Sequence, residues 1–134
     1  MYMSLNHNQI GVKTMDTTKS DNPLFQEPIR KSYDNNHHAI TPWGGADYCY
    51  TYPCGIKFYG TPRHGGFFVP KNLRQCLLPY DINAMDKSWY EEDCEGLKVY
   101  LAFPELVRYQ DDIQNIKTSY ERCFDSKGIY KHFR

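Results

Sequence analysis

The sequence predicts an α+β domain in which a small antiparallel sheet of about three strands is packed by two or three C-terminal helices. Two observations favour this class. Short segments of alternating apolar and polar residues come first, and longer segments with helical periodicity follow. A chain of 134 residues also has the length of one domain. We therefore expect a single domain over residues 39–134, preceded by an N-terminal arm.

Residues 1–38 form the expected arm. They are rich in Asn, Gln, Thr, Ser, Lys and Asp, and their scattered apolar residues show no sustained period. A segment of this kind buries too little apolar surface to fold by itself. We predict that it is flexible or loosely docked, with "NPLFQEPI" (22–29) as the part that holds it to the domain.

Three short strands are predicted in the first half of the domain. "ADYCYTY" (46–52) alternates and is rich in Tyr, "PCG" (53–55) reverses the chain, and "IKFYG" (56–60) alternates again. Together they predict a β-hairpin. After the loop "TPRHGG" (61–66), "FFV" (67–69) predicts the third strand.

Three helical segments are predicted after these strands. Residues 71–78 indicate a short helix that the following proline stops. Residues 91–103 carry acids at their start, where the helix dipole favours negative charge, and apolar residues at helical spacing. Residues 110–124 show the clearest period, with apolar side chains on one side and charged ones on the other.

The charged residues are segregated although the net charge is zero. Residues 57–80 contain four basic residues and no acid, whereas residues 81–95 contain six acids and one lysine. Blocks of opposite sign either pair across the fold or remain as charged faces. An unpaired acidic block would attract a basic partner surface or a cation.

Composition also bounds the compartment and the cofactors. No apolar run approaches the ~20 residues needed to cross a bilayer, and the N-terminal "MYMSLNHNQIGVK" is too polar for a secretory signal. The five cysteines contain no C-x-x-C pair, so they indicate neither a disulfide framework nor a zinc ribbon. We expect a soluble, cytoplasmic protein with no membrane contact, cofactor or metal.

Four motifs carry a family resemblance: "TPWGGAD" (41–47), "GIKFYGTPRHGG" (55–66), "WYEEDC" (89–94) and "AFPEL" (102–106). In this order and spacing they resemble an uncharacterised domain of unknown function found in proteins of phages, plasmids and other mobile elements. The resemblance covers roughly residues 41–105, and Gly60 departs from the family pattern, which has Ser there. It implies no established chemistry. It implies a mobile-element protein that acts in conflict with a host.

One grouping has the residue types of an active site: His64, Glu91, Glu92 and Asp93. Imidazole and carboxylate are the usual acid–base and metal-binding groups, and they would serve a small metal-assisted hydrolase or nuclease. Their spacing matches no recognised metal motif. The alternative is structural, with His64 hydrogen-bonded to an acid and the acids capping the helix that follows. Both interpretations remain open at this point.

The leading hypothesis is a protein that binds and modulates a host or competitor protein, with counter-defence as its expected role and without enzymatic activity. The predicted contact residues are Trp43, Arg63, His64, Asp81, Asp86, Trp89 and Tyr90. A second alternative is a nucleic-acid-binding module, because the basic residues of 57–74 are interleaved with aromatic ones. The zero net charge gives no general attraction to phosphate.

Overall fold

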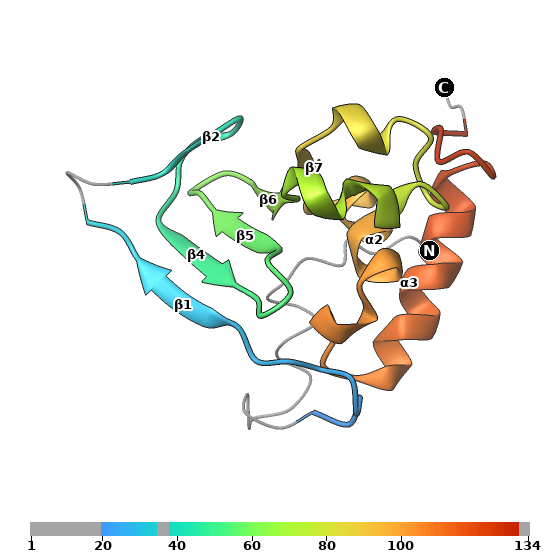
Figure 1. Cartoon of the computed structure of the whole chain (residues 1–134), viewed down its shortest axis with the longest axis horizontal. Helices are drawn as coiled ribbons and strands as arrows, with labels where there is room; N and C mark the ends of the chain where they lie inside the picture. The colour runs from blue at the N-terminus through green and yellow to red at the C-terminus, as the bar shows by residue number, and fades with distance from the viewer. Residues whose placement is uncertain (1–19, 35–37, 132–134) are drawn as a thin grey trace.

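The structure is a computed structural model that describes residues 20–34 and 38–131, so residues 1–19 and 35–37 of the predicted arm lie outside the described residues. Five antiparallel strands form one sheet in the order β1-β4-β5-β6-β7 (Figure 1). Its strands are β1 Ile29–Ser32, β4 Tyr48–Thr51, β5 Lys57–Gly60, β6 Gly65–Phe68 and β7 Trp89–Glu91. The α+β class and the antiparallel sheet are therefore confirmed.

The sheet has five strands and not the three that the sequence predicted. β1 was missed because all four of its residues are exposed, so they carry no alternation of apolar and polar side chains. β7 was missed because three residues are too few to show a period. Since β1 comes from within residues 1–38, part of the segment assigned to the arm belongs to the sheet.

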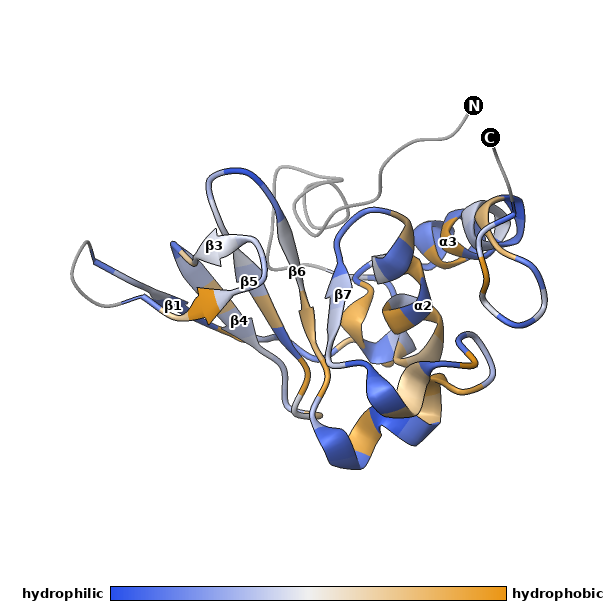
Figure 2. Cartoon of the chain, turned by 90° about the horizontal axis from the view of Figure 1, so that it is seen from above, coloured by the Kyte–Doolittle hydropathy of each residue, from blue (hydrophilic) through white to orange (hydrophobic). Residues whose placement is uncertain are grey.

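Helices pack beside β6 and β7, while β1 lies at the far end of the sheet (Figure 2). The α-helices are α2 Cys94–Ala102 and α3 Gln110–Cys123, and short 3-10 helices are η1 Lys71–Leu77, η2 Ala84–Asp86 and η3 Pro104–Leu106. α3 lies where its periodicity predicted. α2 begins at residue 94 and not at residue 91, because residues 89–91 pair with β6 as strand β7.

The core lies between the sheet and the two α-helices. Phe58, Phe67 and Tyr90 occupy matching positions on neighbouring strands and are all buried. The ring centroid of Phe67 lies 5.0 Å from that of Phe58 and 5.2 Å from that of Tyr100 on α2. Edge-to-face pairs of this kind add to the stability that the buried area alone supplies.

Two consecutive glycines on β6 allow close packing on opposite faces of the sheet. A Cβ on Gly65 would lie 2.8 Å from the ring of Phe58 on the core side. A Cβ on Gly66 would lie 2.2 Å from the ring of Trp43 on the other side. Neither distance is compatible with a side chain, so glycine is required at both positions for the rings to lie where they do.

The described part of the N-terminal segment is held to the domain by polar contacts. The Asn22 side-chain nitrogen donates to the carbonyls of Val107, at 2.7 Å, and Pro104, at 3.0 Å. The Arg108 guanidinium lies 4.6 Å from the ring centre of Phe25. The stretch predicted to pin this segment therefore does contact the domain, close to η3.

Candidate functional site

The loop between β5 and β6 positions His64. The backbone N–H of Thr61 donates to the His64 carbonyl at 2.9 Å, and the His64 N–H donates to the Thr61 hydroxyl at 3.0 Å. These two bonds close a tight turn at the tip of the hairpin, as Thr residues commonly do in loops. The imidazole is thereby presented at one end of the sheet.

The structure brings His64 and Glu91 together. His64 Nδ1 lies 3.0 Å from Glu91 Oε2, although the two residues are far apart in the sequence. Glu91 ends β7 and stands opposite Gly66 in the strand register, which places it beside the loop. The two side chains are 52% and 36% exposed, so the contact lies at the surface. An exposed pair of this kind contributes little to folding stability.

Glu92 connects the same loop to the start of α2. Its N–H donates to the Gly65 carbonyl at 2.9 Å, and its Oε2 accepts the Gly65 N–H at 3.0 Å. Burial raises the pKa of the Glu92 carboxyl above the ordinary 4.5, against the effect of the Gly65 hydrogen bond, and the charges of Asp93 and Glu91 raise it further. Asp93 precedes α2, where its side chain makes no capping hydrogen bond. Through its backbone and its side chain, Glu92 therefore holds Gly65, at the start of β6, against the residues that precede α2.

A histidine held by a carboxylate is an arrangement that can orient an imidazole as a general base. Over residues 20–34 and 38–131, however, no three His, Cys, Asp or Glu side chains are grouped so as to hold a metal ion. Two described hollows lie elsewhere. One, of about 740 Å³, is lined by residues 31–34 and 38–40, and the other is lined by residues of α3 and its surroundings.

Four aromatic side chains gather on the side of the sheet opposite the core. We call this the aromatic face, and it consists of Trp43, Tyr59, Phe68 and Trp89. The ring centroid of Trp89 lies 5.6 Å from Trp43, 5.6 Å from Tyr59 and 5.1 Å from Phe68. All four side chains are partly exposed. Large aromatic rings that remain accessible on a sheet are typical of a contact surface.

The small hairpin of β2 Ile40–Thr41 and β3 Gly44–Gly45 carries Trp43 onto this face. The Thr41 hydroxyl donates to the Gly44 carbonyl at 2.7 Å and accepts the Trp43 N–H at 3.1 Å, which fixes the turn. Gly66 leaves the space that the indole fills. The "TPWG" and "HGG" motifs therefore meet, and their contact orders one side of the aromatic face.

The structure separates the predicted contact residues into two groups. Trp43, Arg63, His64, Asp86 and Trp89 have exposed or half-buried side chains, and Trp43, His64 and Trp89 lie on or next to the aromatic face. The other two, which the sequence also assigned to the contact surface, are interior.

Asp81 is 1% exposed and Tyr90 is fully buried, so neither forms part of an exposed surface. Tyr90 faces inward because it alternates with Trp89 along β7. Burial raises the pKa of the Tyr90 hydroxyl, and the nearby Asp81 carboxylate raises it further. Both residues therefore belong to the packing of the domain.

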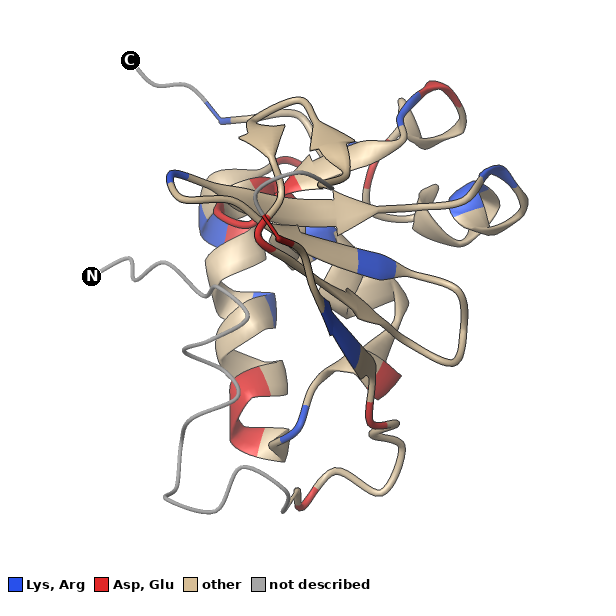
Figure 3. Ribbon diagram, turned by 90° about the vertical axis from the view of Figure 1, so that its left-hand side faces the viewer, with Lys and Arg blue, Asp and Glu red and all other residues tan. Residues whose placement is uncertain are grey.

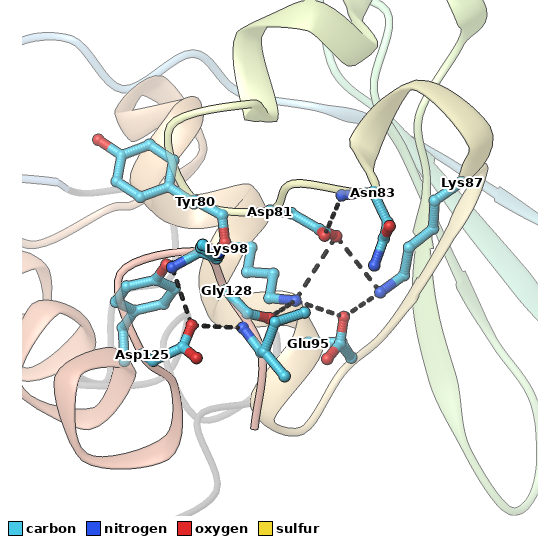
Figure 4. Close-up of polar contacts among 11 residues, drawn as sticks. Tyr80, Asp81, Asn83, Lys87, Glu95, Lys98, Asp125 and Gly128 are labelled. Atoms are coloured by element: carbon cyan, nitrogen blue, oxygen red, sulfur yellow. Dashed lines mark hydrogen bonds and ion pairs between the residues drawn. The ribbon is translucent and has the colours of Figure 1, made fainter. Parts of the chain in front are cut away.

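Asp81 belongs to a buried ion cluster that neutralises part of the acidic block (Figure 4). Lys98, 2% exposed on α2, has its Nζ 3.1 Å from Glu95 Oε1, 3.5 Å from Asp81 Oδ2 and 2.8 Å from the Gly128 carbonyl. Lys87 contacts the same two carboxylates. The two acids and two lysines thus compensate one another, which leaves less of the block free to attract a partner.

The predicted contact residues did not include Tyr59 and Phe68, which entered only as aromatic residues of the nucleic-acid alternative. The signal was present, because strand alternation places them on the face opposite Phe58 and Phe67. What the sequence did not indicate was the register of the strands. That register places Tyr59 and Phe68 on the same side of the sheet as Trp89.

The fold and this surface define a small α+β domain with one helix-covered sheet face and one partly open aromatic face. The chain belongs to a domain-of-unknown-function family, DUF7007, whose family model matches residues 36–128. No curated protein and no solved structure matches this chain. Within the described part of the chain, no helix combines the length and apolar character needed to cross a membrane.

Proposed function

We propose that this protein is a binding protein without enzymatic activity, and that its aromatic face contacts a partner protein. The observation that carries the proposal is the grouping of Trp43, Tyr59, Phe68 and Trp89 as partly exposed rings on the sheet face away from the helices. Trp and Tyr dominate the binding energy of protein interfaces, usually from the centre of the contact.

The rings support binding because they are already held in place. Trp89 touches three other rings, and Trp43 rests against Gly66. Side chains ordered before association lose little further entropy when a partner arrives. Around them stand polar groups, among them Lys57 on β5 and the His64–Glu91 pair. An apolar centre with a polar rim is the usual organisation of a protein–protein interface.

The identity of the partner is proposed from the family resemblance of the sequence. The resemblance to proteins of phages, plasmids and other mobile elements implies a partner from a host cell or from a competing element. In this proposal the protein acts in the host cytoplasm, where it modulates that partner in counter-defence. Such a role requires specific binding and no catalysis, which fits a contact surface built of aromatic rings.

The test is capture of a partner from host lysate by the wild type and by surface variants. Phe68→Ala and Trp43→Ala each remove one ring of the aromatic face. Ile82→Ala is the matched control, since Ile82 is apolar and 54% exposed in the loop that bonds to Lys127, away from this face. We expect a stoichiometric partner with wild type and control, and a loss of at least tenfold in affinity with the two ring variants.

A partner that binds all four proteins equally would overturn the choice of surface, and recovery of no stoichiometric partner would count against the binding role. Intrinsic fluorescence gives a second readout, because both tryptophans of the chain, Trp43 and Trp89, lie on the aromatic face. A purified partner should change this fluorescence with a saturable dependence on concentration. An unchanged spectrum in a confirmed complex would exclude the aromatic face from the contact.

One observation favours the nucleic-acid alternative. Three basic residues lie on strands of the sheet, Arg30 and Lys31 on β1 and Lys57 on β5, and further basic residues lie on the helices and in loops (Figure 3). Lys57 pairs in register with Phe68, so a cation stands next to the aromatic face. Rings flanked by cations can stack with the bases of a single strand. This alternative requires salt-sensitive binding that Arg63→Ala and Lys71→Ala weaken, and binding unaffected by both would eliminate it.

The hydrolase alternative rests on the contact between His64 and Glu91. That alternative predicts that His64→Ala abolishes function with little change in the thermal midpoint, because the pair is largely exposed. The binding role predicts at most a modest loss of affinity from the same change. Measuring partner capture and thermal midpoint on one His64→Ala preparation separates the two.

A further inference from the structure

Two cysteines that the proposed function does not use lie against each other. Cys94 is the first residue of α2 and Cys123 is the last residue of α3, two helices that lie side by side (Figure 1). Their Sγ atoms are 3.2 Å apart, and both residues are partly exposed. Cys94 also closes the "WYEEDC" motif, which ties this contact to the segment that carries Glu91 and Glu92.

The geometry is close to that of a disulfide. A disulfide has its sulfurs about 2.05 Å apart, so the two Sγ atoms need to approach by only about 1 Å. We expect rotation of the two short side chains to supply this shift. The partial exposure of both residues gives a small oxidant access to the sulfurs.

We propose that Cys94 and Cys123 are a redox modification site, at which a peroxide converts the two thiols into a reversible disulfide that links α2 to α3. In the first step the Cys94 sulfur gives up its proton and attacks one oxygen of hydrogen peroxide, and the other oxygen takes that proton. The sulfur is oxidised to the sulfenic acid as the O–O bond breaks, and one water leaves. In the second step the Cys123 sulfur displaces the sulfenic hydroxyl, which leaves as a second water with the Cys123 proton. Two thiols and one peroxide thus give one disulfide and two waters.

The environment of the pair favours this order of steps. Burial, together with the hydrogen bond to Cys94, raises the pKa of the Cys123 thiol to about 12. Cys123 therefore stays protonated near neutral pH and is a poor first target for the peroxide, since the thiolate is the reactive species. It is well placed as the resolving thiol, at 3.2 Å from the sulfur that would be oxidised.

The bond would constrain the start of α2. It closes a loop from residue 94 to residue 123 and joins the beginning of one helix to the end of the other. Closing a loop of this size removes freedom mainly from the unfolded chain, so the oxidised protein should be more stable. Reduction by a cellular dithiol would restore the open form, as is usual for disulfides in reducing compartments.

The test uses the full chain and dilute hydrogen peroxide. Peptide mapping under non-reducing conditions should recover a peptide containing Cys94 linked to one containing Cys123. The thermal midpoint should rise by about 10 °C and return to its starting value with dithiothreitol. Cys76→Ser is the matched control, because Cys76 is exposed and belongs to η1. It should behave as the wild type does.

In the Cys76→Ser background, Cys94→Ser and Cys123→Ser should each abolish both the linked peptide and the shift in midpoint. Mapping of the wild type alone decides the matter if either variant folds poorly. Recovery of a linked peptide from another pair of cysteines would overturn the proposal. So would a peroxide-treated wild type that keeps both thiols titratable, or a midpoint shift that persists in Cys94→Ser.

Discussion

Replacing Lys98 with Met removes the charge at the centre of the buried ion cluster and keeps most of the side-chain volume. In the wild type the Lys98 Nζ touches Glu95, Asp81 and the Gly128 carbonyl, and it lies 4.4 Å from the ring centre of Phe124. The Met side chain preserves the packing against this ring. It leaves two carboxylates that share a single remaining lysine, and one carbonyl without its donor.

The expected loss follows from the burial of these groups. Lys98 and Asp81 have side chains only 2% exposed, so water cannot replace the missing ammonium without opening the structure. Removing one partner of a buried ion pair costs about 3–5 kcal/mol. A domain of this size has a free energy of unfolding of roughly 5–15 kcal/mol, so the change should lower the thermal midpoint by about 10–20 °C.

Chemical denaturation of four proteins tests this reasoning: the wild type, Lys98→Met, Glu95→Gln and the double variant. Because the single changes leave unbalanced charge and the double change restores balance, the double variant should lose less stability than the two single losses added together, by about 0.5–3 kcal/mol. Lys117→Met on the exposed side of α3 is the control and should stay within about 0.5 kcal/mol. A loss below about 1 kcal/mol for Lys98→Met would refute the argument from burial.

Three further outcomes are expected from other contacts. Glu92→Ala should cost about 1–3 kcal/mol by denaturation because it strips the buried Gly65 N–H of its acceptor, whereas Glu92→Gln should cost much less because the amide oxygen still accepts. Gly66→Ala should lower stability by about 1–3 kcal/mol and alter tryptophan fluorescence, since its Cβ would meet Trp43; an unchanged spectrum would contradict this. Acid should unfold the protein as pH falls below about 4. Burial raises the pKa of Asp81, but the hydrogen bond from Asn83 and the charges of Lys87 and Lys98 outweigh it and hold that pKa below the ordinary 3.8, so the stabilisation present above 3.8 is lost on protonation.

Sequence periodicity predicted those helices and strands that bury one side and expose the other. α3 buries Ile116 and Tyr120 on one side and exposes its charges on the other, and its predicted and observed limits nearly coincide. β1 has no buried side, because the helices lie at the other end of the sheet. Its pairing with β4 is made by backbone groups, which carry no sequence signal. A strand of this kind is recognised only from the structure.

The sequence predicted the meeting of His64 with an acid in the candidate site, but it did not predict which charged residues are buried. Motif order brought His64 and the acids of 91–93 into one hypothesis, and the structure places His64 on Glu91. Whether the acids of residues 81–95 remain exposed depends on the positions of individual lysines in the fold. Lys98 lies on the buried face of α2, where the sequence predicted apolar packing. It forms an ion pair with Asp81, which is also buried. Such a pairing joins residues from separate elements, and local pattern does not reveal it.

The two glycines of β6 make the sheet unusually thin at one point. Phe58 presses on the backbone from the core side at Gly65, and Trp43 presses on it from the other side at Gly66. Only a peptide's thickness separates the helix-packed interior from the surface proposed to meet a partner. A molecule that displaces the indole by a fraction of an ångström would therefore shift the magnetic environment of the Phe58 ring. The NMR resonances of the buried Phe58 ring should therefore respond to a contact made on the opposite face of the sheet.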